Sequence, residues 1–279
     1  MPVRITSPAR MLVPALFDSP HSGTDYPDDF RPALDMAILR RGEDLFVDAL
    51  FDAAPGAGAP LIAATFPRSY IDPNRNERDI DDALLDVPWP GPLEVSTKTT
   101  WRGTGLVWRR VGGEHDIYDR KLSVAEVAAR IDRCWRPYHD AMSDTYDRLH
   151  ADFGRVYHVN CHSMPSMGDA ATEDGPVARA DFVLGDRDGS ACDGAFTQFV
   201  YDQLEAMGYD VKINDPMKGV ELVRRYSDPA AGRHSLQIEV NRRLYMDEGT
   251  FEKNHLFDRT KADLDRLVTA ICTYAAEVA

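Results

Sequence analysis

The sequence predicts an α/β fold, and two observations support this prediction. Short apolar runs typical of buried strands alternate along the chain with longer segments of helical periodicity. No internal repeat, low-complexity tract or evident linker interrupts this alternation. Such alternation favours one mixed or mostly parallel sheet that is covered by helices. We therefore expect a single domain over residues 1–279.

The predicted strands are short apolar runs bounded by residues that favour turns. The first begins at Val13 and stops at Asp18, after which proline, serine and glycine follow. The last alternates Leu236, Ile238 and Val240 with polar residues, which is the pattern of a strand with one apolar face. In order, strands are expected at residues 13–17, 61–66, 156–161, 180–185, 209–214 and 235–240.

The predicted helices are segments in which apolar side chains recur every three or four residues. Ser123 can cap the longest of them, because Glu126 stands three residues later and completes a capping box. The polar, proline-rich segment 72–92 predicts a long loop of the kind that often has a function. In order, helices are expected at residues 43–53, 123–153, 192–207 and 251–279.

Composition and charge exclude several classes of protein. A hydrophobic content of 43% over 279 residues is enough for a sizeable core, which excludes a disordered or fibrous chain. The chain has 32 Lys+Arg and 46 Asp+Glu, and its net charge of −14 argues against binding to nucleic acid or to an anionic membrane surface. An anionic substrate would therefore need a local cluster of arginines.

The cysteines and the N-terminal segment predict the environment of the protein. The cysteines are widely spaced and form no CxxC pair, so we expect buried free thiols rather than disulfides or a cysteine-rich zinc site. The N-terminal segment lacks the apolar stretch of a signal peptide, and no run approaches membrane-spanning length. We expect a soluble cytoplasmic protein that is a monomer or a small homo-oligomer. The four cysteines are Cys134, Cys161, Cys192 and Cys272.

Two histidines stand where predicted strands end. His21 lies in SPHSGTDYP and His162 in NCHSMPS, and each is followed by a serine and a turn. Strand ends are where α/β proteins gather their binding sites, so two imidazoles at one sheet edge could bind a metal ion. A catalytic zinc typically has three protein ligands from histidine and carboxylate groups, plus one water. A lone turn histidine is more often structural, so the prediction depends on the repeated pattern.

The third ligand should be a carboxylate at the end of an element. Glu43 and Asp44 begin the predicted helix 43–53. Acidic residues at this position are also explained by the helix dipole. Asp25, four residues after His21, is a further candidate. The spacing of the residues leaves the choice among these three open.

Glu239 is a candidate for general acid/base chemistry. It lies in the alternating segment 235–240, where a central strand would bury it. Burial raises the pKa of a carboxyl group towards the range useful for a general base. An ion pair with Arg242 or Arg243, or a solvated face, explains the pattern equally well.

Asn74 and Arg75 are candidates for substrate binding. They follow Asp72, which Pro73 keeps extended, in the segment IDPNR. Arginine suits the recognition of a carboxylate, because it can donate two parallel hydrogen bonds. A surface network of ion pairs with neighbouring aspartates is the commoner outcome for such a run.

Other common catalytic motifs do not occur in the chain. There is no GxxxxGK phosphate-binding loop, no GxSxG nucleophile elbow and no HExxH helix. Metal-assisted hydrolysis is the chemistry that the residues support best.

Taken together, these segments resemble the N-formylglutamate amidohydrolase family, whose members release formate from N-formyl-L-glutamate in histidine degradation. The resemblance covers nearly the whole chain. The family in turn is similar to zinc carboxypeptidases and aspartoacylases, which implies a three-layer α/β/α sandwich with a mixed, mostly parallel sheet. The segments that carry the resemblance are, in order, SPHSGTDYP, EDLFVDALF, PRSYIDPNR, NCHSMPS, ADFVLGDRDG and QIEVNRRLYMDE.

The resemblance also implies roles for individual residues. It implies one Zn²⁺ ion, for which other divalent metals could substitute, held by His21, His162 and an acidic ligand for which Asp44 is favoured. Zinc carboxypeptidases place a glutamate three residues after the first histidine, but this chain has Thr24 there, so the acidic ligand must come from elsewhere.

The implied substrate is a small anionic N-acyl amino acid. Glu239 would be the general acid/base, and Asn74 with Arg75 would bind the terminal carboxylate of the substrate. Arg179 or Arg242 would meet its side-chain carboxylate. The alternatives are another zinc N-acyl-amino-acid amidohydrolase, a carboxypeptidase-like peptidase, or a metal-free binding protein on the same fold.

Overall fold

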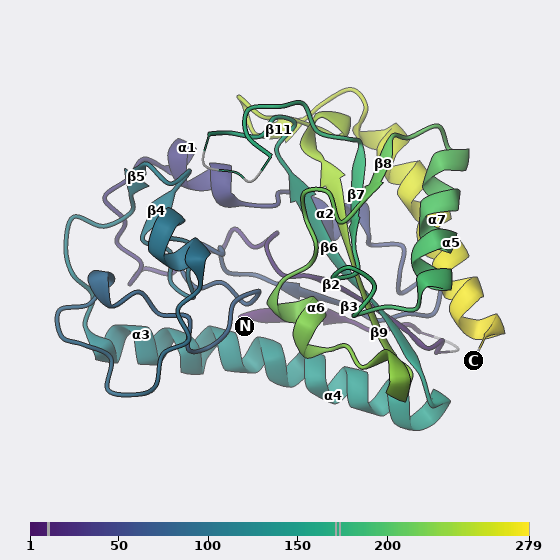
Figure 1. Ribbon diagram of the computed structural model, residues 1–279, viewed down its shortest axis with the longest axis horizontal. Coiled ribbons are helices and arrows are strands. Elements are labelled where there is room, and N and C mark those ends of the chain that lie inside the picture. The colour runs from purple at the N-terminus through teal and green to yellow at the C-terminus, as the bar shows by residue number, and fades with distance from the viewer. Residues whose placement is uncertain (10–11, 171, 173, 279) are drawn as a thin grey trace.

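The computed structural model describes residues 1–9, 12–170, 172 and 174–278. Within these residues, a seven-stranded sheet forms the centre of the molecule (Figure 1). The strand order is β1-β3-β2-β6-β9-β7-β8. The strands are β1 (Val3–Thr6), β2 (Ala15–Ser19), β3 (Leu61–Ala64), β6 (Val156–Met164), β7 (Phe182–Gly185), β8 (Val211–Ile213) and β9 (Arg233–Asn241).

The pairing of the strands makes the sheet mixed and mostly parallel, as predicted. The four central strands β3, β2, β6 and β9 run parallel to one another. β1 is antiparallel to β3 and β7 is antiparallel to β9, whereas β8 is parallel to β7. The carboxyl ends of four neighbouring strands therefore meet at one edge of the sheet, where α/β proteins place their sites.

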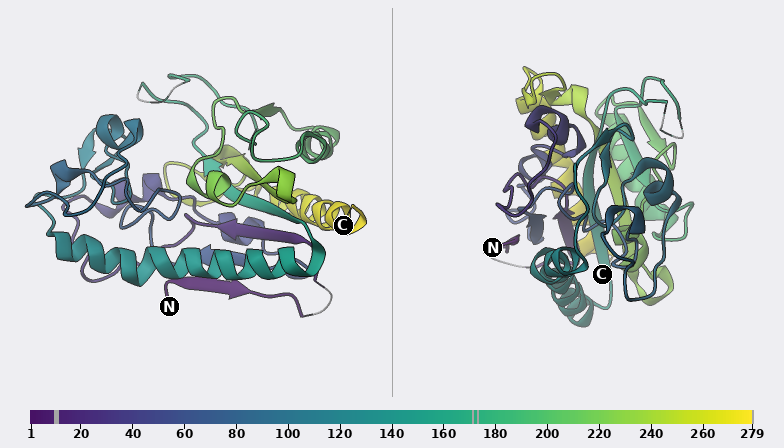
Figure 2. Two further views of the ribbon diagram at one scale, coloured as in Figure 1. Left: turned by 60° about the horizontal axis from the view of Figure 1, so that its bottom comes forward. Right: turned by 90° about the vertical axis from the view of Figure 1, so that its left-hand side faces the viewer.

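Helices cover both faces of the sheet, which confirms the predicted α/β/α sandwich. α4 (Arg136–Phe153) contacts β1, β2, β3 and β6, and α6 (Glu221–Arg225) contacts β9. α2 (Val47–Leu50), α5 (Gly194–Ala206) and α7 (Phe257–Glu277) pack together on the opposite face. One long helical segment runs along the molecule (Figure 2). It consists of α3 (Val124–Arg130), a π-helical turn (Ile131–Trp135) and α4.

Short elements fill the connections around this core. They are α1 (Met36–Leu39), the hairpins β4 (Arg110–Val111) with β5 (His115–Asp116) and β10 (Met246–Asp247) with β11 (Glu252–Lys253), a π-helical turn (Lys98–Arg102), and 3-10 turns at Arg40–Gly42, Asp82–Leu84, Pro229–Ala231 and Arg242–Leu244.

The alternation of side chains along β6 and β9 follows the prediction. Tyr157, Val159 and Cys161 of β6 belong to one apolar core, together with Leu236, Ile238 and Val240 of β9. Six polar residues of the two strands are on the other face and are also buried, so this face is a polar layer inside the protein (His158, Asn160, His162, Ser235, Gln237 and Glu239).

Several predicted boundaries are wrong, and two of them have a clear physical cause. The first strand continues through Asp18 and Ser19, because the buried Asp18 carboxylate is satisfied there. It accepts hydrogen bonds from His158 Nε2 (2.8 Å) and Tyr138 Oη (2.5 Å). In the predicted helix 43–53 only α2 is helical, because Phe46 adopts a left-handed conformation (φ 64°) just before it.

Other predictions are confirmed. Ser123 and Glu126 form the capping box at the start of α3. The C-terminal helix is present, but its predicted start at residue 251 is wrong: it begins at Phe257, because the β10–β11 hairpin occupies the preceding segment. All four cysteines are buried and free. Among the described residues, no helix is both long enough and apolar enough to span a bilayer.

Candidate metal centre

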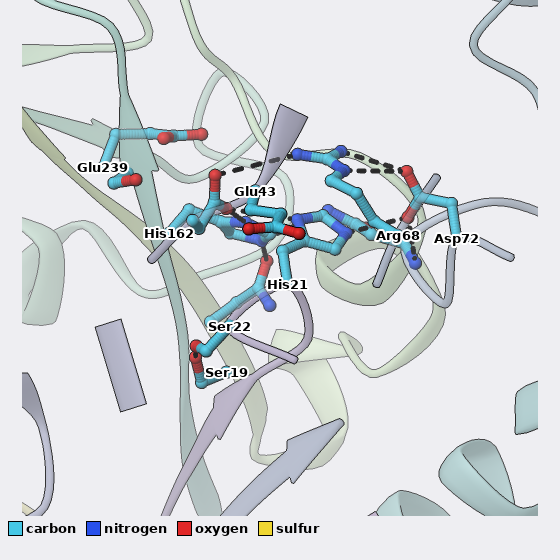
Figure 3. Close-up of polar contacts among 12 residues, drawn as sticks. Ser19, His21, Ser22, Glu43, Arg68, Asp72, His162 and Glu239 are labelled. Atoms are coloured by element: carbon cyan, nitrogen blue, oxygen red, sulfur yellow. Dashed lines mark hydrogen bonds and ion pairs between the residues drawn. The ribbon is translucent and has the colours of Figure 1, made fainter. Parts of the chain in front are cut away.

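Three side chains that lie far apart in the sequence converge at the carboxyl edge of the sheet. His21, Asp44 and His162 are buried, and one potential ligand atom of each lies within 4.8 Å of the other two. Asp44 Oδ2 is 3.2 Å from His21 Nδ1 and 3.0 Å from His162 Nδ1. Figure 3 shows the two imidazoles side by side, with Glu239 on one flank and Arg68 with Asp72 on the other.

The topology of the sheet places both histidines. β2 and β6 are parallel neighbours, so His21, just after β2, and His162, near the end of β6, reach the same edge. The backbone also ties Asp44 to His21, since Asp44 N donates to His21 O (3.0 Å). Gly23 lets this turn lie against β3, because a Cβ atom there would be 2.3 Å from the carbonyl carbon of Thr65.

Hydrogen bonds of the Nε2 atoms define the orientation of both imidazoles. His21 Nε2 donates to Asp72 Oδ1 (2.8 Å), and His162 Nε2 donates to Asn160 Oδ1 (2.8 Å). In neutral rings each Nδ1 then presents a lone pair towards Asp44, as in metal-binding histidines whose other nitrogen is held by an oxygen. Three acceptor atoms thus face one another without a proton between them, which is an arrangement that a cation would satisfy.

The spacing of these atoms fits a small divalent ion. Ligands about 2.0 Å from a tetrahedral zinc ion lie about 3.3 Å apart. The separations of 3.0 and 3.2 Å at Asp44 are close to this value. Two imidazoles and one carboxylate form a donor set that could hold a divalent metal ion, and Asp44 also lines the cavity.

Asp44 is the carboxylate that reaches the histidines. Burial raises its pKa, but the close imidazoles of His162 and His21 and the charge of Arg68 outweigh this effect and hold the pKa well below its usual value. Glu43 turns away and accepts hydrogen bonds from Tyr26 and Arg40, and Asp25 is exposed. Of the three candidates left open by the sequence, Asp44 is therefore the one that lies close to both histidines.

Asp72 supports His21 from behind and was not identified as a site residue from the sequence. Besides His21, its carboxylate accepts hydrogen bonds from Asn74 N (2.8 Å), Trp108 Nε1 (3.1 Å) and both Nε and Nη2 of Arg68 (3.2 and 3.0 Å). Burial raises its pKa, but Arg68 and His21 more than offset this, so the pKa lies well below its usual value. Asp72 is therefore a fixed negative charge behind the imidazole.

Glu239 lies directly across from His162, as its register partner in the parallel pair of β6 and β9. Its carboxylate accepts a hydrogen bond from Gln237 Nε2 (2.9 Å) and contributes to the cavity wall. Burial raises the pKa of Glu239, His162 lowers it, and the nearby Asp44 charge raises it further, so that the net pKa is above its usual value. A carboxylate with a raised pKa can accept and return a proton near neutral pH.

A buried polar network continues behind His162. Asn160 Nδ2 donates to Asp18 Oδ1 (2.8 Å), which also accepts from His158 Nε2. His158 Nδ1 lies 2.7 Å from Ser235 Oγ, so Ser235, His158 and Asp18 have the order of a catalytic triad. All three are completely buried and have no access for a substrate, so this arrangement is structural.

A cavity of about 780 Å³ opens onto Asp44 and Glu239. Its basic lining residues outnumber its acidic ones, although the whole chain carries a net charge of −14. This is the local cluster of arginines that an anionic substrate requires. The basic residues are Arg41, Arg68, Arg75, Lys98, Arg102, Arg179 and Arg242, and the acidic ones are Asp44, Glu114, Asp169, Glu239 and Glu248.

Arg75, Arg179 and Arg242 all line this cavity, but they differ in their internal contacts. Arg75 donates to two backbone carbonyls, those of Thr104 (2.8 Å) and Asn74 (2.8 Å). Arg179 makes a two-pronged ion pair with Asp174 (2.7 and 3.0 Å). Arg242 donates to Ser163, to the carbonyls of Arg41 and Glu43 and to Asp44 (3.2 Å), so it also holds the Asp44 carboxylate.

Asn74 is buried behind the site rather than on the cavity wall. Its amide nitrogen lies 3.2 Å from His162 Nε2, and its amide oxygen accepts a hydrogen bond from Leu222 N (2.9 Å). Direct contact between Asn74 and a substrate stays a prediction.

Arg68 and Arg102 are cavity residues that the sequence analysis missed. Arg68 lies over the ring of Trp108 (4.8 Å) and pairs with Asp72. It follows the predicted strand 61–66, so the rule that sites gather at strand ends could have identified it. Arg102 belongs to a π-helical turn, which no pattern of residues in the sequence indicates.

The chain is similar to known proteins of one family. The family model of the N-formylglutamate amidohydrolases matches residues 13–246. An N-formylglutamate deformylase of Pseudomonas putida is 29% identical over 95% of this chain and 94% of its own length. The enzyme of the same name from Pseudomonas aeruginosa is 28% identical over 96% of both chains. The crystal structure of an N-formylglutamate amidohydrolase from Ralstonia eutropha JMP134 superposes with a TM-score of 0.95 at 47% identity, over 100% of this chain and 99% of that one.

Proposed function

The chain belongs to the N-formylglutamate amidohydrolase family, and from this premise we propose that it hydrolyses N-formyl-L-glutamate to formate and L-glutamate, as in histidine degradation. The observation that carries the proposal is the position of Glu239 beside the converging group His21, Asp44 and His162, on the wall of a cavity rich in arginine. That combination suits the hydrolysis of an amide in a small anionic molecule.

The metal is proposed to be one zinc ion held by His21 Nδ1, His162 Nδ1 and Asp44 Oδ2. When bound, such an ion supplies Lewis acidity, which polarises the formyl carbonyl and makes water a better nucleophile near neutral pH. Asp72 and Asn160 keep the two imidazoles in the tautomer that offers Nδ1 to the ion. Other divalent metals with a preference for nitrogen and oxygen ligands could serve in the same site.

Glu239 is proposed to move the proton. Its raised pKa suits a group that accepts a proton from the attacking water and then delivers it to the leaving amine nitrogen. Gln237 holds one carboxylate oxygen, which leaves the other able to face the water. The products are formate and the free amine of glutamate.

Arg75 is proposed to bind the α-carboxylate of the substrate. Its guanidinium is fixed by the carbonyls of Thr104 and Asn74, so that little side-chain entropy is lost when a carboxylate binds. Asn74 would act on the same substrate group or, as its contact with His162 suggests, through the imidazole. Arg179 and Arg242 stay candidates for the side-chain carboxylate.

The test combines metal analysis with a panel of substrates. The purified protein should contain nearly one zinc per chain and should hydrolyse N-formyl-L-glutamate faster than N-acetyl or longer N-acyl derivatives. A preference for a larger acyl group would instead make the chain another N-acyl-amino-acid amidohydrolase or a peptidase. Absence of both metal and hydrolysis would favour a binding protein.

One substitution examines the proposed acid/base. Glu239→Gln should retain the zinc and lose most turnover, by a factor of about 100 or more. Glu114→Gln is the matched control, because Glu114 also lines the cavity but is exposed on the β4–β5 connection. Full activity in Glu239→Gln would contradict the assignment.

A further inference from the structure

One wall of the cavity is made by two loop segments that are tied together. Arg75 Nε donates to Thr104 O (2.8 Å), so the loop after Asp72 is anchored to the segment that follows the π-helical turn Lys98–Arg102. Gly103 ends this turn in a left-handed conformation (φ 71°). Arg75 and Arg102 therefore lie on the same wall and both line the cavity.

Arg102 differs from the other cavity arginines in its contacts. Its Nε atom is buried and has no hydrogen-bond partner within the described part of the chain. The carboxylate of Asp169 is 3.8 Å from its Nη2 atom, beyond hydrogen-bonding distance, and that side chain is 54% exposed. A buried donor of a charged group that lacks a partner costs free energy unless a ligand satisfies it.

Three other cavity arginines are engaged by the protein itself. Arg68 pairs with Asp72, and Arg179 pairs with Asp174 through two nitrogens. Arg242 is held by backbone carbonyls and by Asp44. Each of these has internal acceptors that a substrate would have to displace or share, whereas the donor of Arg102 is available.

The positive charges on this wall of the cavity also favour the binding of an anion. Burial lowers the pKa of Arg75, the charges of Asp72 and Asp79 raise it, and the charges of Arg68 and Arg102 lower it, so that the net pKa is below its usual value. The guanidinium groups of Arg75 and Arg102 thus repel each other in a partly desolvated place. A ligand with two carboxylates would relieve this repulsion and satisfy the Nε donor of Arg102.

We propose that Arg102 is the residue that binds the side-chain carboxylate of the substrate and makes the enzyme specific for dicarboxylic N-acyl amino acids. The inference rests on the proposed function and deepens it, because Arg75 would bind the α-carboxylate while Arg102 binds the second one. It places the specificity on the π-helical turn rather than on Arg179 or Arg242.

The experiment compares a charged and a neutral substrate of similar shape. The value of kcat/KM is measured for N-formyl-L-glutamate and N-formyl-L-glutamine with the wild type and with Arg102→Gln. Arg102→Gln should lower kcat/KM for the glutamate substrate about 100-fold, mainly through KM, because its carboxylate loses a charged partner. The same variant should change kcat/KM for the glutamine substrate less than about threefold. Arg102→Lys keeps the charge without the planar group and should give an intermediate loss.

Two further variants separate the alternatives. Arg179→Gln should not reproduce the selective loss, and neither should Arg41→Gln, which removes a charge from an exposed part of the cavity wall. Equal losses on both substrates in Arg102→Gln, no loss, or a selective loss in Arg179→Gln would overturn the inference. Melting temperatures verify that the variants fold.

A binding measurement distinguishes failure of the inference from failure of the proposed function. Calorimetry gives Kd for L-glutamate and L-glutamine with the wild type and Arg102→Gln, without any turnover. A wild type that hydrolyses neither N-formyl substrate would contradict the proposed function. A preference for glutamate that Arg102→Gln abolishes would still support the subsite, and a preference that it leaves intact would overturn it.

Discussion

His162 and Glu239 are register partners in the parallel pair of β6 and β9, so the sheet itself sets a metal-ligand candidate beside a carboxylate with a raised pKa. The neighbouring strand β2 delivers His21 to the same edge, and the turn before α2 delivers Asp44. Rigid elements hold these groups, as a reaction that depends on sub-ångström placement requires.

The first prediction concerns Asp44 as the proposed acidic ligand. Asp44→Asn removes the negative charge between the two Nδ1 atoms with little change in volume, so zinc content measured by mass spectrometry should fall at least about tenfold. Glu43→Gln is the control, because Glu43 precedes Asp44 but bonds to Tyr26 and Arg40. Loss of zinc in Glu43→Gln with retention of zinc in Asp44→Asn would show that Glu43, and not Asp44, is the acidic ligand.

The second prediction concerns support behind the metal centre. Asp72→Asn weakens the hydrogen bond that orients His21, so the Kd for zinc should rise about 10- to 100-fold, as measured by competition with a chelator. Asp25→Asn, at the exposed carboxylate closest in sequence to His21, should leave the Kd unchanged. An unchanged Kd in Asp72→Asn would show that His21 is positioned by its backbone alone.

The third prediction is that the buried triad is not catalytic. Ser235→Ala removes the hydroxyl beside His158 and should destabilise the protein by about 1 kcal/mol, as judged from urea denaturation. Its kcat should stay within about threefold of the wild type, because none of Ser235, His158 and Asp18 has any exposed surface. A loss of a thousandfold or more in kcat would indicate that a substrate reaches this serine.

The fourth prediction concerns pH. Burial lowers the pKa of His139 to about 3, and the charge of Arg225 adds to this effect. The folded protein therefore binds fewer protons here than the unfolded chain between the two pKa values, about 3 and about 6.5. His139 should thus lower the free energy of unfolding by about 1.4 kcal/mol for each pH unit below about 6.5.

Replacement of this histidine isolates its share of the pH dependence. His139 Nε2 donates to the Pro73 carbonyl (2.9 Å), so His139→Gln should be less stable than the wild type at pH 8. Its stability should nevertheless fall less steeply from pH 6.5 to pH 4, and the exposed His255→Gln should retain the slope of the wild type. Parallel curves for His139→Gln and the wild type would contradict a neutral buried imidazole.

The repeated pattern of a strand followed by histidine and serine was enough to predict the meeting of His21 and His162. Parallel strands share their carboxyl edge, so two such strand ends come together whatever the details of packing. The same alternation in β9 placed Glu239 opposite the apolar core. These predictions depend only on strand periodicity and on topology.

Loop residues were predictable to a smaller extent, because contacts distant in sequence determine their conformation. Asp72 reaches His21 only because its backbone is held by Leu106, whose carbonyl accepts from Asp72 N (2.7 Å). Arg102 reaches the cavity from a π-helical turn with no apolar periodicity. The apolar spacing in segment 43–53 gave a helix that is too long, since the hydrogen bond from Asp44 N to His21 O holds its start in a turn.

Zinc titration of the metal-free protein tests whether the reaction requires a metal ion at His21, Asp44 and His162. The initial rate of formate release from N-formyl-L-glutamate should rise with added zinc and reach a plateau at one ion per chain. With Asp44→Asn the rate should stay near zero at the same zinc concentrations. Full activity in the metal-free wild type, or an equal response to zinc in Asp44→Asn, would contradict catalysis at His21, Asp44 and His162.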